Sequence, residues 1–231
     1  MNESVRTLEE EGETLAERAA ARLQSEILSG QIPPGSRLGV TALAAGYGIG
    51  ATPIREGLSR LVSKGLIVAI GRRGFRVSEV SGSDLADITR LRVLIELEGL
   101  RLSLEKGGDA WETAILASLH RLRLFVERHG ERFGEGSPEF DALHKGFHAS
   151  LIAGCGSPRI RDAASSLYDQ AYRYRRLMMN ELTNPESFIA SHEALAKAVI
   201  SRNQPLAETY LKGHLESTLH YVYPETRGEA G

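Results

Sequence analysis

The amino-acid sequence predicts a mostly α-helical protein in which three short helices and a β-hairpin precede an all-α bundle of about six helices. Two observations support this fold class. In the first 78 residues, three helical segments come before two β-rich runs that flank a turn. After residue 80, apolar residues recur every three or four positions and no segment has a clear strand pattern. The sequence therefore predicts domains at 14–78 and 84–222, a linker at 79–83, and flexible tails at 1–13 and 223–231.

The first domain has the element order of a winged helix-turn-helix, a DNA-binding fold. Its first helix begins at Thr14, because Thr14 and Glu17 have the spacing of a capping box, and Gly30 ends it. A short helix begins near Thr41, and a third helix follows a turn and ends at Gly65. The runs "LIVAI" and "FRVSEV" then flank "GRRG", which predicts a two-stranded hairpin as the wing.

The second domain is predicted to consist of helices alone, separated by breaks such as "GGD", "GCGSP" and "TNP". In the first helix, an apolar stripe with a spacing of three to four is typical of a face packed on a core. Its members are Leu91, Leu94, Ile95, Gly99 and Leu102. The predicted helices are 83–106, 109–129, 137–153, 157–180, 185–202 and 205–222.

Charge is distributed unevenly along the 231 residues. The net charge of −2 alone argues against nucleic-acid binding. Residues 1–13, however, carry about −4, whereas residues 14–78 carry eight arginines, one lysine and three glutamates, a net of about +6. A basic block of this size beside a neutral or acidic remainder is typical of a DNA-binding module attached to a partner domain.

The chain is predicted to be cytoplasmic and to have no membrane partner. Cys155 is the only cysteine, so no internal disulfide can form. No apolar run approaches the roughly 18 residues that a membrane span needs. The acidic N-terminus also lacks the apolar segment of a secretory signal.

The stretch "SRLGVTALAAGYGIGATPIREGLSRLVSKGLI" resembles the winged helix-turn-helix of the GntR regulators, since "PG.RL", "LA..YG", "TP.RE.L.RL...GL" and "RRGF.V" match together. The helical region resembles the FCD ligand-binding domain of the FadR-like branch, through "RLRVLIELEGL", "FHASLIAGCGSPRI" and "LYDQAYRYRRL". Within that branch the chain looks most like the carbon-starvation-induced regulators of dicarboxylate catabolism. The resemblance implies a homodimeric transcription regulator, most often a repressor, that binds a palindromic double-stranded DNA operator and responds to a small organic acid.

The predicted recognition helix points its first turn at base edges in the major groove. Thr52 offers a hydroxyl, and Arg55 can bind a guanine or a phosphate. Gly50 and Thr52 also present N–H groups at a helix N-terminus, which suit a phosphate. The alternative is that Arg55 forms an ion pair with Glu56 or Glu26 and does not contact DNA.

Arg72 and Arg73 lie at the predicted tip of the wing, where they suit phosphate or minor-groove contact, although a solvated turn is the alternative. The chain departs from the family pattern at two positions. GntR regulators usually carry an arginine where this chain has Ala51, and often another where it has Thr41. Losing two guanidinium groups predicts an operator that differs from the common family sequence.

Two histidines in "HKGFH", His144 and His148, are four residues apart and share one face of a predicted helix. Such a pair can bind a metal ion or simply lie on a polar helix surface. A zinc hydrolase of the His-Glu-x-x-His type needs a glutamate after the first histidine as general base, and Lys145 occupies that position. A metal-dependent hydrolase is therefore the weakest interpretation, and the chain is predicted not to be an enzyme.

The resemblance also implies a metal site. In metal-binding FCD domains, one helix supplies an aspartate and a histidine four residues apart, and two later helices supply one histidine each. Here His148, His192 and His214 match the three histidines, and His144 stands at the aspartate position. Four imidazoles suit a divalent transition metal such as zinc or nickel. Asp141 shares the same helix face and is a candidate substitute ligand or hydrogen-bond partner of a ligand.

A small carboxylate effector is expected beside the metal or on it, as the resemblance implies. Arg92 matches an arginine often placed near the pocket. Within "YRYRR" at 172–176, Tyr172 and Arg173 are the predicted contacts, because a guanidinium can bind a carboxylate through two hydrogen bonds. At least half of those five residues are expected to face solvent. The alternative is a metal-responsive regulator whose effector is the ion itself.

Overall fold

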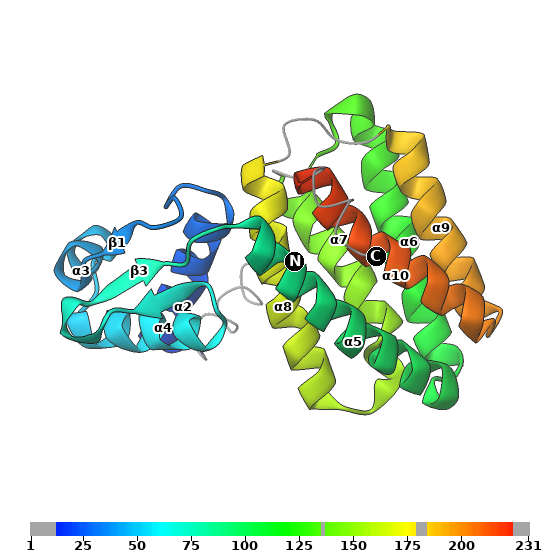
Figure 1. Cartoon of the computed structure of the whole chain (residues 1–231), viewed down its shortest axis with the longest axis horizontal. Coiled ribbons are helices and arrows are strands. Elements are labelled where there is room, and N and C mark those ends of the chain that lie inside the picture. The colour runs from blue at the N-terminus through cyan, green and yellow to red at the C-terminus, as the bar shows by residue number, and fades with distance from the viewer. Residues whose placement is uncertain (1–12, 135–136, 179–183, 224–231) are drawn as a thin grey trace, which may run out of the picture. The chain divides into compact units, whose positions relative to one another are not determined.

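The computed structural model describes residues 13–134, 137–178 and 184–223. The predicted tails, except for Glu13 and Tyr223, lie outside these residues. The chain forms two compact units, residues 1–80 and residues 81–231 (Figure 1). The helix that opens the second unit begins at Gly82, within the segment predicted as the linker.

The first unit contains three helices, α2 (Leu15–Leu28), α3 (Val40–Tyr47) and α4 (Ala51–Ser63). The predicted capping box begins α2, since the Thr14 hydroxyl accepts from the Glu17 N–H and the Glu17 carboxylate accepts from the Thr14 N–H. Gly57 allows α2 to lie close against α4, because a Cβ at this position would stand 3.0 Å from the backbone nitrogen of Ala20. The two helices bury an apolar core that includes Leu23, Ile27, Ile54, Leu58 and Leu61.

Three short antiparallel strands form one sheet in the order β1-β3-β2: β1 (Arg37–Leu38), β2 (Ile67–Ala69) and β3 (Phe75–Val77). Strands β2 and β3 are the predicted hairpin. The structure corrects the prediction of a two-stranded wing, because β1 pairs with β3 through Arg37 opposite Arg76 and Leu38 opposite Phe75. Two residues are too few for an alternating pattern to indicate a strand, and this pairing depends on a partner far along the chain.

The second unit is a bundle of α-helices, as predicted: α5 (Gly82–Lys106), α6 (Asp109–His129), α7 (Pro138–Leu151), α8 (Pro158–Met178), α9 (Pro185–Ile200) and α10 (Gln204–Val222). In Figure 1, α5 and α8 run side by side on one flank, α6 and α9 on the other, and α7 and α10 lie between them. The core between the helices is apolar and rich in leucine and phenylalanine. Within the described ranges, no helix has the length and apolar character needed to cross a membrane.

The face of α5 that packs on the core differs from the predicted stripe. Leu91 and Leu94 are 49% and 62% exposed, whereas Leu85, Ile88 and Leu100 are buried. The prediction was therefore wrong for the first two members of the stripe. Spacing alone does not identify the core-facing side when, as in α5, leucines occur on more than one face of the helix.

The prediction that at least half of "YRYRR" faces solvent is also wrong. Four of its five residues are buried: Tyr172, Arg173, Tyr174 and Arg175. The C-terminal half of α8 makes polar contacts on two sides. The Tyr174 hydroxyl donates to the Asp84 carboxylate at the start of α5, and Arg175 lies 3.4 Å from the Thr218 hydroxyl on α10. These contacts allow a strongly polar segment to occupy the interior of the bundle.

Candidate nucleic-acid interface and metal centre

The N-terminal turn of α4 presents polar groups to solvent. Gly50 is the N-cap residue, and no side chain of the described residues caps this terminus. Its first N–H groups are therefore available to a phosphate. Ile54 and Leu58 are fully buried and fix the orientation of the helix, so that Thr52 and Arg55 are exposed. The residues predicted to contact DNA from this helix thus share an accessible face.

The alternative role of Arg55, an ion pair with Glu26 or Glu56, is not supported by the ion pairs among the described residues. Glu26 pairs instead with Arg22, at 2.9 Å, and accepts from the Tyr47 hydroxyl. Burial and the bond to Glu26 raise the pKa of Tyr47, which keeps the phenol protonated as a donor. The Arg55 side chain is left on the exposed face of α4.

The tip of the wing is a single 3₁₀ turn, Gly71–Arg73, between β2 and β3. Gly71 and Gly74 have φ values of +48° and +94°, which only glycine adopts readily, so these two residues allow the tight reversal. Arg73 is exposed. Arg72 belongs to the same turn, but its side chain lies outside the described part of the structure.

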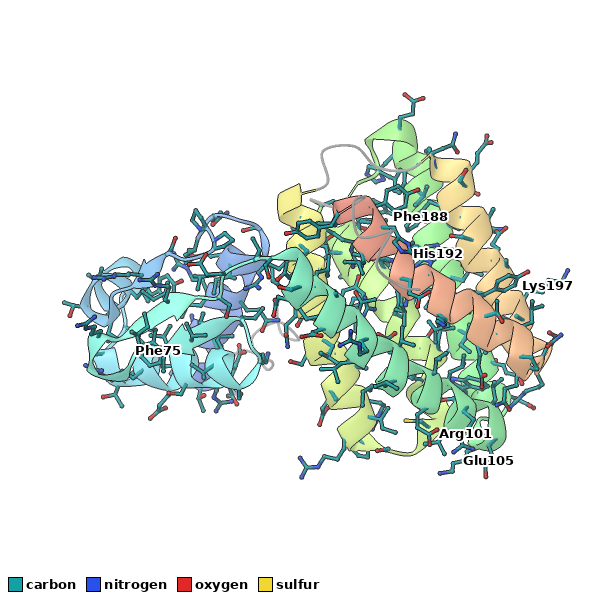
Figure 2. The ribbon with its side chains drawn as sticks, viewed as in Figure 1. Phe75, Arg101, Glu105, Phe188, His192 and Lys197 are labelled. Carbon is teal, nitrogen blue, oxygen red and sulfur yellow. The ribbon has the colours of Figure 1, made fainter. Side chains whose placement is uncertain are left out.

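Four histidines from three helices meet inside the second unit. His144 and His148 come from α7, His192 from α9 and His214 from α10, and one ring nitrogen of each lies within 4.8 Å of those of the others. The first three side chains are buried, and His214 is partly buried. Figure 2 shows His192 on the side of α9 that faces α10. The structure therefore brings together the four candidate ligands, and Asp141 is not a member of the group.

Hydrogen bonds orient two of these rings. Nδ1 of His192 lies 2.6 Å from the carbonyl oxygen of Phe188, which can only accept, so Nδ1 carries the proton and Nε2 a lone pair. Nδ1 of His144 lies 3.1 Å from the hydroxyl of Tyr168, which can accept in the same way. Metal-binding histidines commonly donate their other N–H to a carbonyl or a similar group. The protein thus holds both rings as it would hold metal ligands.

The spacing of one pair of nitrogens fits a zinc ion, and all four ligand nitrogens lie within 4.8 Å of one another. Nε2 of His144 and Nε2 of His148 are 3.2 Å apart. Zinc with Zn–N bonds of about 2.0–2.1 Å places tetrahedral ligand nitrogens about 3.3 Å from one another. Nε2 of His192 is buried and has no hydrogen-bond partner among the described residues. Because such a group costs roughly 1–3 kcal/mol, an ion that accepts its lone pair is favoured over a purely polar cluster.

Burial lowers the pKa of all four imidazoles. The pKa of His192 falls to about 4, chiefly through desolvation and to a lesser extent through the positive charge of Arg175. Desolvation holds the other three well below their usual range, and neighbouring histidines and Arg175 add to the effect. Neutral imidazole is the form that binds metals, so these lone pairs are available at neutral pH.

A cavity of about 490 Å³ reaches two members of the cluster, His144 and His214. Arg175 lies on its wall and brings a positive charge beside the histidines. The volume is in the range of small-molecule pockets. The hydroxyl-bearing residues of the wall are Ser187, Ser191, Thr209, Tyr210, Ser217, Thr218 and Tyr221. The wall also includes Phe188 and Ala194, so Arg175, the histidines and the hydroxyls are the polar groups of a largely apolar cavity, an arrangement that can orient a small anion.

The predicted effector residues lie outside the described wall of this cavity, which includes neither Arg92, Arg173 nor Tyr172. Arg92 forms a buried ion pair with Glu96, at 2.8 Å. Its charge contributes to the low pKa of His148. Arg92 is therefore close to the histidine cluster, but the carboxylate that it binds is one of the protein's own.

Sequence reasoning did not single out Arg175, although it lies in the segment "YRYRR". Its position on the helix, once the contacts of α8 are known, explains its place in the site. Tyr168, which contacts His144, stands seven residues before Arg175, or two helical turns, so both side chains lie on one face of α8. The guanidinium of Arg175 accordingly lies 5.1 Å from the centre of the Tyr168 ring.

Comparison with protein families gives two matches. Residues 15–77 match the bacterial regulatory proteins of the gntR family, and residues 87–217 match the FCD domain. The first range covers the elements from α2 to β3, and the second runs from within α5 to within α10. The division into families thus follows the division into compact units.

The chain is 32% identical over 209 residues to the HTH-type transcriptional regulator BphR of Paraburkholderia xenovorans (strain LB400), a match that covers 90% of this chain and 85% of BphR. It is 31% identical over 211 residues to the HTH-type transcriptional repressor GlaR of Escherichia coli (strain K12), covering 89% and 94%. Among solved structures, E. coli McbR/YncC superposes with a TM-score of 0.74 at 21% identity, over 93% of this chain and 100% of that one. A GntR regulator from Rhodococcus sp. RHA1 gives 0.70 at 20% identity, over 90% and 97%. At these identities the structural likeness shows a shared fold.

We predict that the metal-free protein loses stability as the pH falls from 7 to 4.5. Unfolded histidines take up protons near pH 6.5, whereas folded His192 does so only near pH 4. Between these values the unfolded state binds more protons, so the free energy of unfolding decreases by up to about 1.4 kcal/mol per pH unit for each such histidine. Denaturant unfolding of the chelator-treated protein at several pH values measures this slope.

Two variants isolate the contribution of the cluster. His192→Gln removes one buried imidazole and should make the slope shallower, while His220→Gln, at an exposed position, should leave the slope unchanged. Equal slopes in the wild type and His192→Gln would contradict the assignment of the acid sensitivity to the buried ring.

Proposed function

Because this chain belongs to the GntR family of bacterial regulators and carries an FCD domain after its winged helix-turn-helix, we propose that it is a homodimeric transcriptional repressor controlled by a small carboxylate. The observation that carries this proposal is the cluster of four histidines beside a cavity with Arg175 on its wall. The name of GlaR, a repressor, supports the direction of control. In this proposal the protein acts in the cytoplasm, on operators that are palindromic because the protein is dimeric.

The proposed DNA contacts come from α4 and the wing. Arg55 and Thr52 read base edges in the major groove, and the free N–H groups that follow Gly50 bind a phosphate. Arg72 and Arg73 contact the backbone or the minor groove from the wing. Two copies place their recognition helices about 34 Å apart, one turn of DNA, which sets the spacing of the half-sites.

The proposed metal ligands are His144, His148, His192 and His214. An all-nitrogen donor set suits zinc or nickel better than magnesium or calcium. The bound ion would supply a Lewis-acidic position for a carboxylate oxygen. The protein's own contribution is to keep the imidazoles neutral through burial and to fix their rings through Phe188 and Tyr168.

A carboxylate effector follows from the charge of this site. Four neutral imidazoles leave the double charge of an ion uncompensated, and Arg175 adds a further positive charge within the same cavity. The Arg92–Glu96 pair is neutral as a unit. A small dianion restores the balance, and Arg175 is placed to bind one of its carboxylates through two hydrogen bonds. The resemblance to regulators of dicarboxylate catabolism supports the same class of ligand.

A second candidate is a regulator that senses the ion itself. The all-nitrogen donor set favours it, because the site could then discriminate transition metals from the abundant hard ions without an organic ligand. The two candidates differ in what alters operator affinity, the metal alone or the metal together with an acid. Metal-dependent hydrolysis is not proposed, since Lys145, beside the first histidine, pairs with Asp169 at 2.6 Å.

We predict that Arg55→Ala weakens binding to a specific operator by roughly 1–3 kcal/mol for each half-site, because a guanidinium contact to a base edge is lost. The operator would be selected from random duplex DNA with the wild-type protein, and affinity measured by gel shift. Arg73→Ala should instead weaken binding to all sequences alike and reduce the salt slope by about one.

The matched control for both variants is Arg128→Ala, which removes an exposed arginine from α6 in the other unit and should bind DNA as the wild type does. If Arg55→Ala kept the wild-type preference for the selected operator, α4 would not read bases through this side chain.

We predict that protein purified without a histidine tag and given Zn²⁺ or Ni²⁺ holds about one equivalent after dialysis. His148→Ala or His192→Ala should reduce this to less than a tenth of an equivalent, because each removes one of four ligands. His120→Ala, an exposed histidine on α6, should retain the metal. Elemental analysis and the thermal shift on adding metal measure the outcome. If the wild-type protein held no metal and showed no thermal shift, the four histidines would be a buried polar cluster and not a metal site.

We predict that zinc-loaded protein is stabilised by small dicarboxylates, with a rise in melting temperature that grows with ligand concentration. Arg175→Gln should abolish this response while the zinc-induced shift persists, whereas Arg121→Gln, at an exposed position on α6, should keep both. A response that survived in Arg175→Gln would place the acid elsewhere. Operator binding with and without the acid, each at saturating zinc, separates the two candidate functions.

A further inference from the structure

The exposed face of α5 has an unusual combination of charge and apolar character. Leu94 is 62% exposed and Leu91 is 49% exposed, and both belong to the same stripe along the helix. The charged residues of that stripe are highly accessible: Asp87, Arg90, Glu98 and Arg101. Figure 2 shows Arg101, with Glu105, at the outer edge of the bundle near the C-terminal end of α5. A single exposed leucine needs no explanation, but two exposed leucines with charged residues before and after them on the same stripe do.

The signs of these charges are antisymmetric about Leu94. Four residues before it stands Arg90 and four residues after it stands Glu98. Seven residues before it stands Asp87 and seven residues after it stands Arg101. If two such helices run antiparallel with Leu94 against Leu94, each residue meets the one at the same distance on the other side. Arg90 then faces Glu98 of the second copy, and Asp87 faces Arg101 of the second copy.

We propose that this face of α5 is a homodimer contact, in which two copies pair about a two-fold axis that passes through Leu94. Helical rise places the two ion-pair levels about 6 Å and about 10 Å from the axis on each side, within the length of an ordinary helix contact. The proposal rests on the dimeric regulator proposed above, and it specifies the surface in the second unit through which the two copies meet.

The neighbouring register that pairs the two exposed leucines is less favourable. A shift that pairs Leu91 with Leu94 of the second copy places Asp87 opposite Glu98, and like charges oppose each other on both sides of the axis. In the register centred on Leu94, all four charged residues find opposite partners at the same time. This charge pattern is what identifies a second copy of the chain, rather than another apolar partner, as the occupant of the surface.

The first test uses a feature of a two-fold axis, which brings a residue opposite its own copy. Leu94→Cys should form a disulfide-linked dimer under mild oxidation, since facing Cα atoms of helices packed 8–10 Å apart are within disulfide range. The background is low because the native Cys155 is buried. The control is Leu116→Cys on α6, where the native leucine is 52% exposed, and this variant should stay monomeric on a non-reducing gel. Equal cross-linking of the two variants would overturn the proposal.

The second test examines the charges without DNA, by sedimentation of the full chain over a range of concentrations. Arg90→Glu places two glutamates opposite each other on both sides of the axis and should weaken the dimer by at least about tenfold. Adding Glu98→Arg should restore it. Both substitutions break ion pairs within α5, Arg90 with Asp87 and Glu98 with Arg101, so a purely intrahelical role predicts a further loss instead of restoration.

Lys212→Glu on α10 is the matched control, because it reverses an exposed charge that forms an i,i+4 pair with Glu216 and should leave dimerisation unchanged. If Arg90→Glu left the dimerisation constant unchanged, the proposal that α5 forms the dimer contact would be overturned. Such a result leaves the proposed repressor intact, because operator binding is measured separately.

Discussion

The second unit depends on one constraint. The four imidazole rings inside its helical bundle need partners for their buried nitrogens. Each ring has two nitrogens, and a buried nitrogen without a partner is costly. The structure meets part of this demand with protein groups, the Phe188 carbonyl for His192 and the Tyr168 hydroxyl for His144. One nitrogen of each ring lies within 4.8 Å of those of the other three. Three helices, α7, α9 and α10, must therefore keep the rotation that aims their histidines inward, and α8 must supply Tyr168 and Arg175 from a single face.

This arrangement explains why the C-terminal half of α8 is buried although its sequence is polar. This half of the helix contributes a hydroxyl to one histidine, a guanidinium to the cavity and another hydroxyl to the start of α5, so its polar side chains face the interior. Its buried arginines lie close to its tyrosine rings, as Arg173 does to Tyr174. Tyr168 and Tyr172 stack with their planes 6° apart, and Arg175 lies near both rings. Polarity in the sequence was therefore a poor guide to exposure in this segment.

Much of the fold could be predicted from the sequence because its signals are local. The capping box at Thr14, the breaks between helices and the pattern of the β2–β3 hairpin each involve only a few neighbouring residues. The strand β1 could not be predicted, since two residues carry no period and Leu38 needs Phe75 as its partner. The four histidines were identified through a resemblance and one helical spacing, but their convergence depends on packing among three helices. Arg175 was missed because choosing among adjacent arginines requires the phase of α8 relative to its neighbours.

Helix α5 links the parts of this molecule that the proposed function has to couple. Arg92 and Glu96 form a buried pair next to His148, while Leu91 and Leu94 lie on the exposed side of the same two turns. The N-terminus of α5, capped by Ser81, immediately follows the DNA-binding unit, and Asp84 in its first turn is held by Tyr174 of α8. Ligands shift a conformational equilibrium only by contacting two states differently. In the proposed function, a dianion bound to Arg175 would act on α8, which contacts the first turn of α5. A small rotation of α8 would then reach the helix that, in the proposed dimer, sets the distance between two copies. Rigid helices joined by a few buried polar contacts are well suited to coupling two sites. Such contacts have discrete arrangements and do not deform gradually.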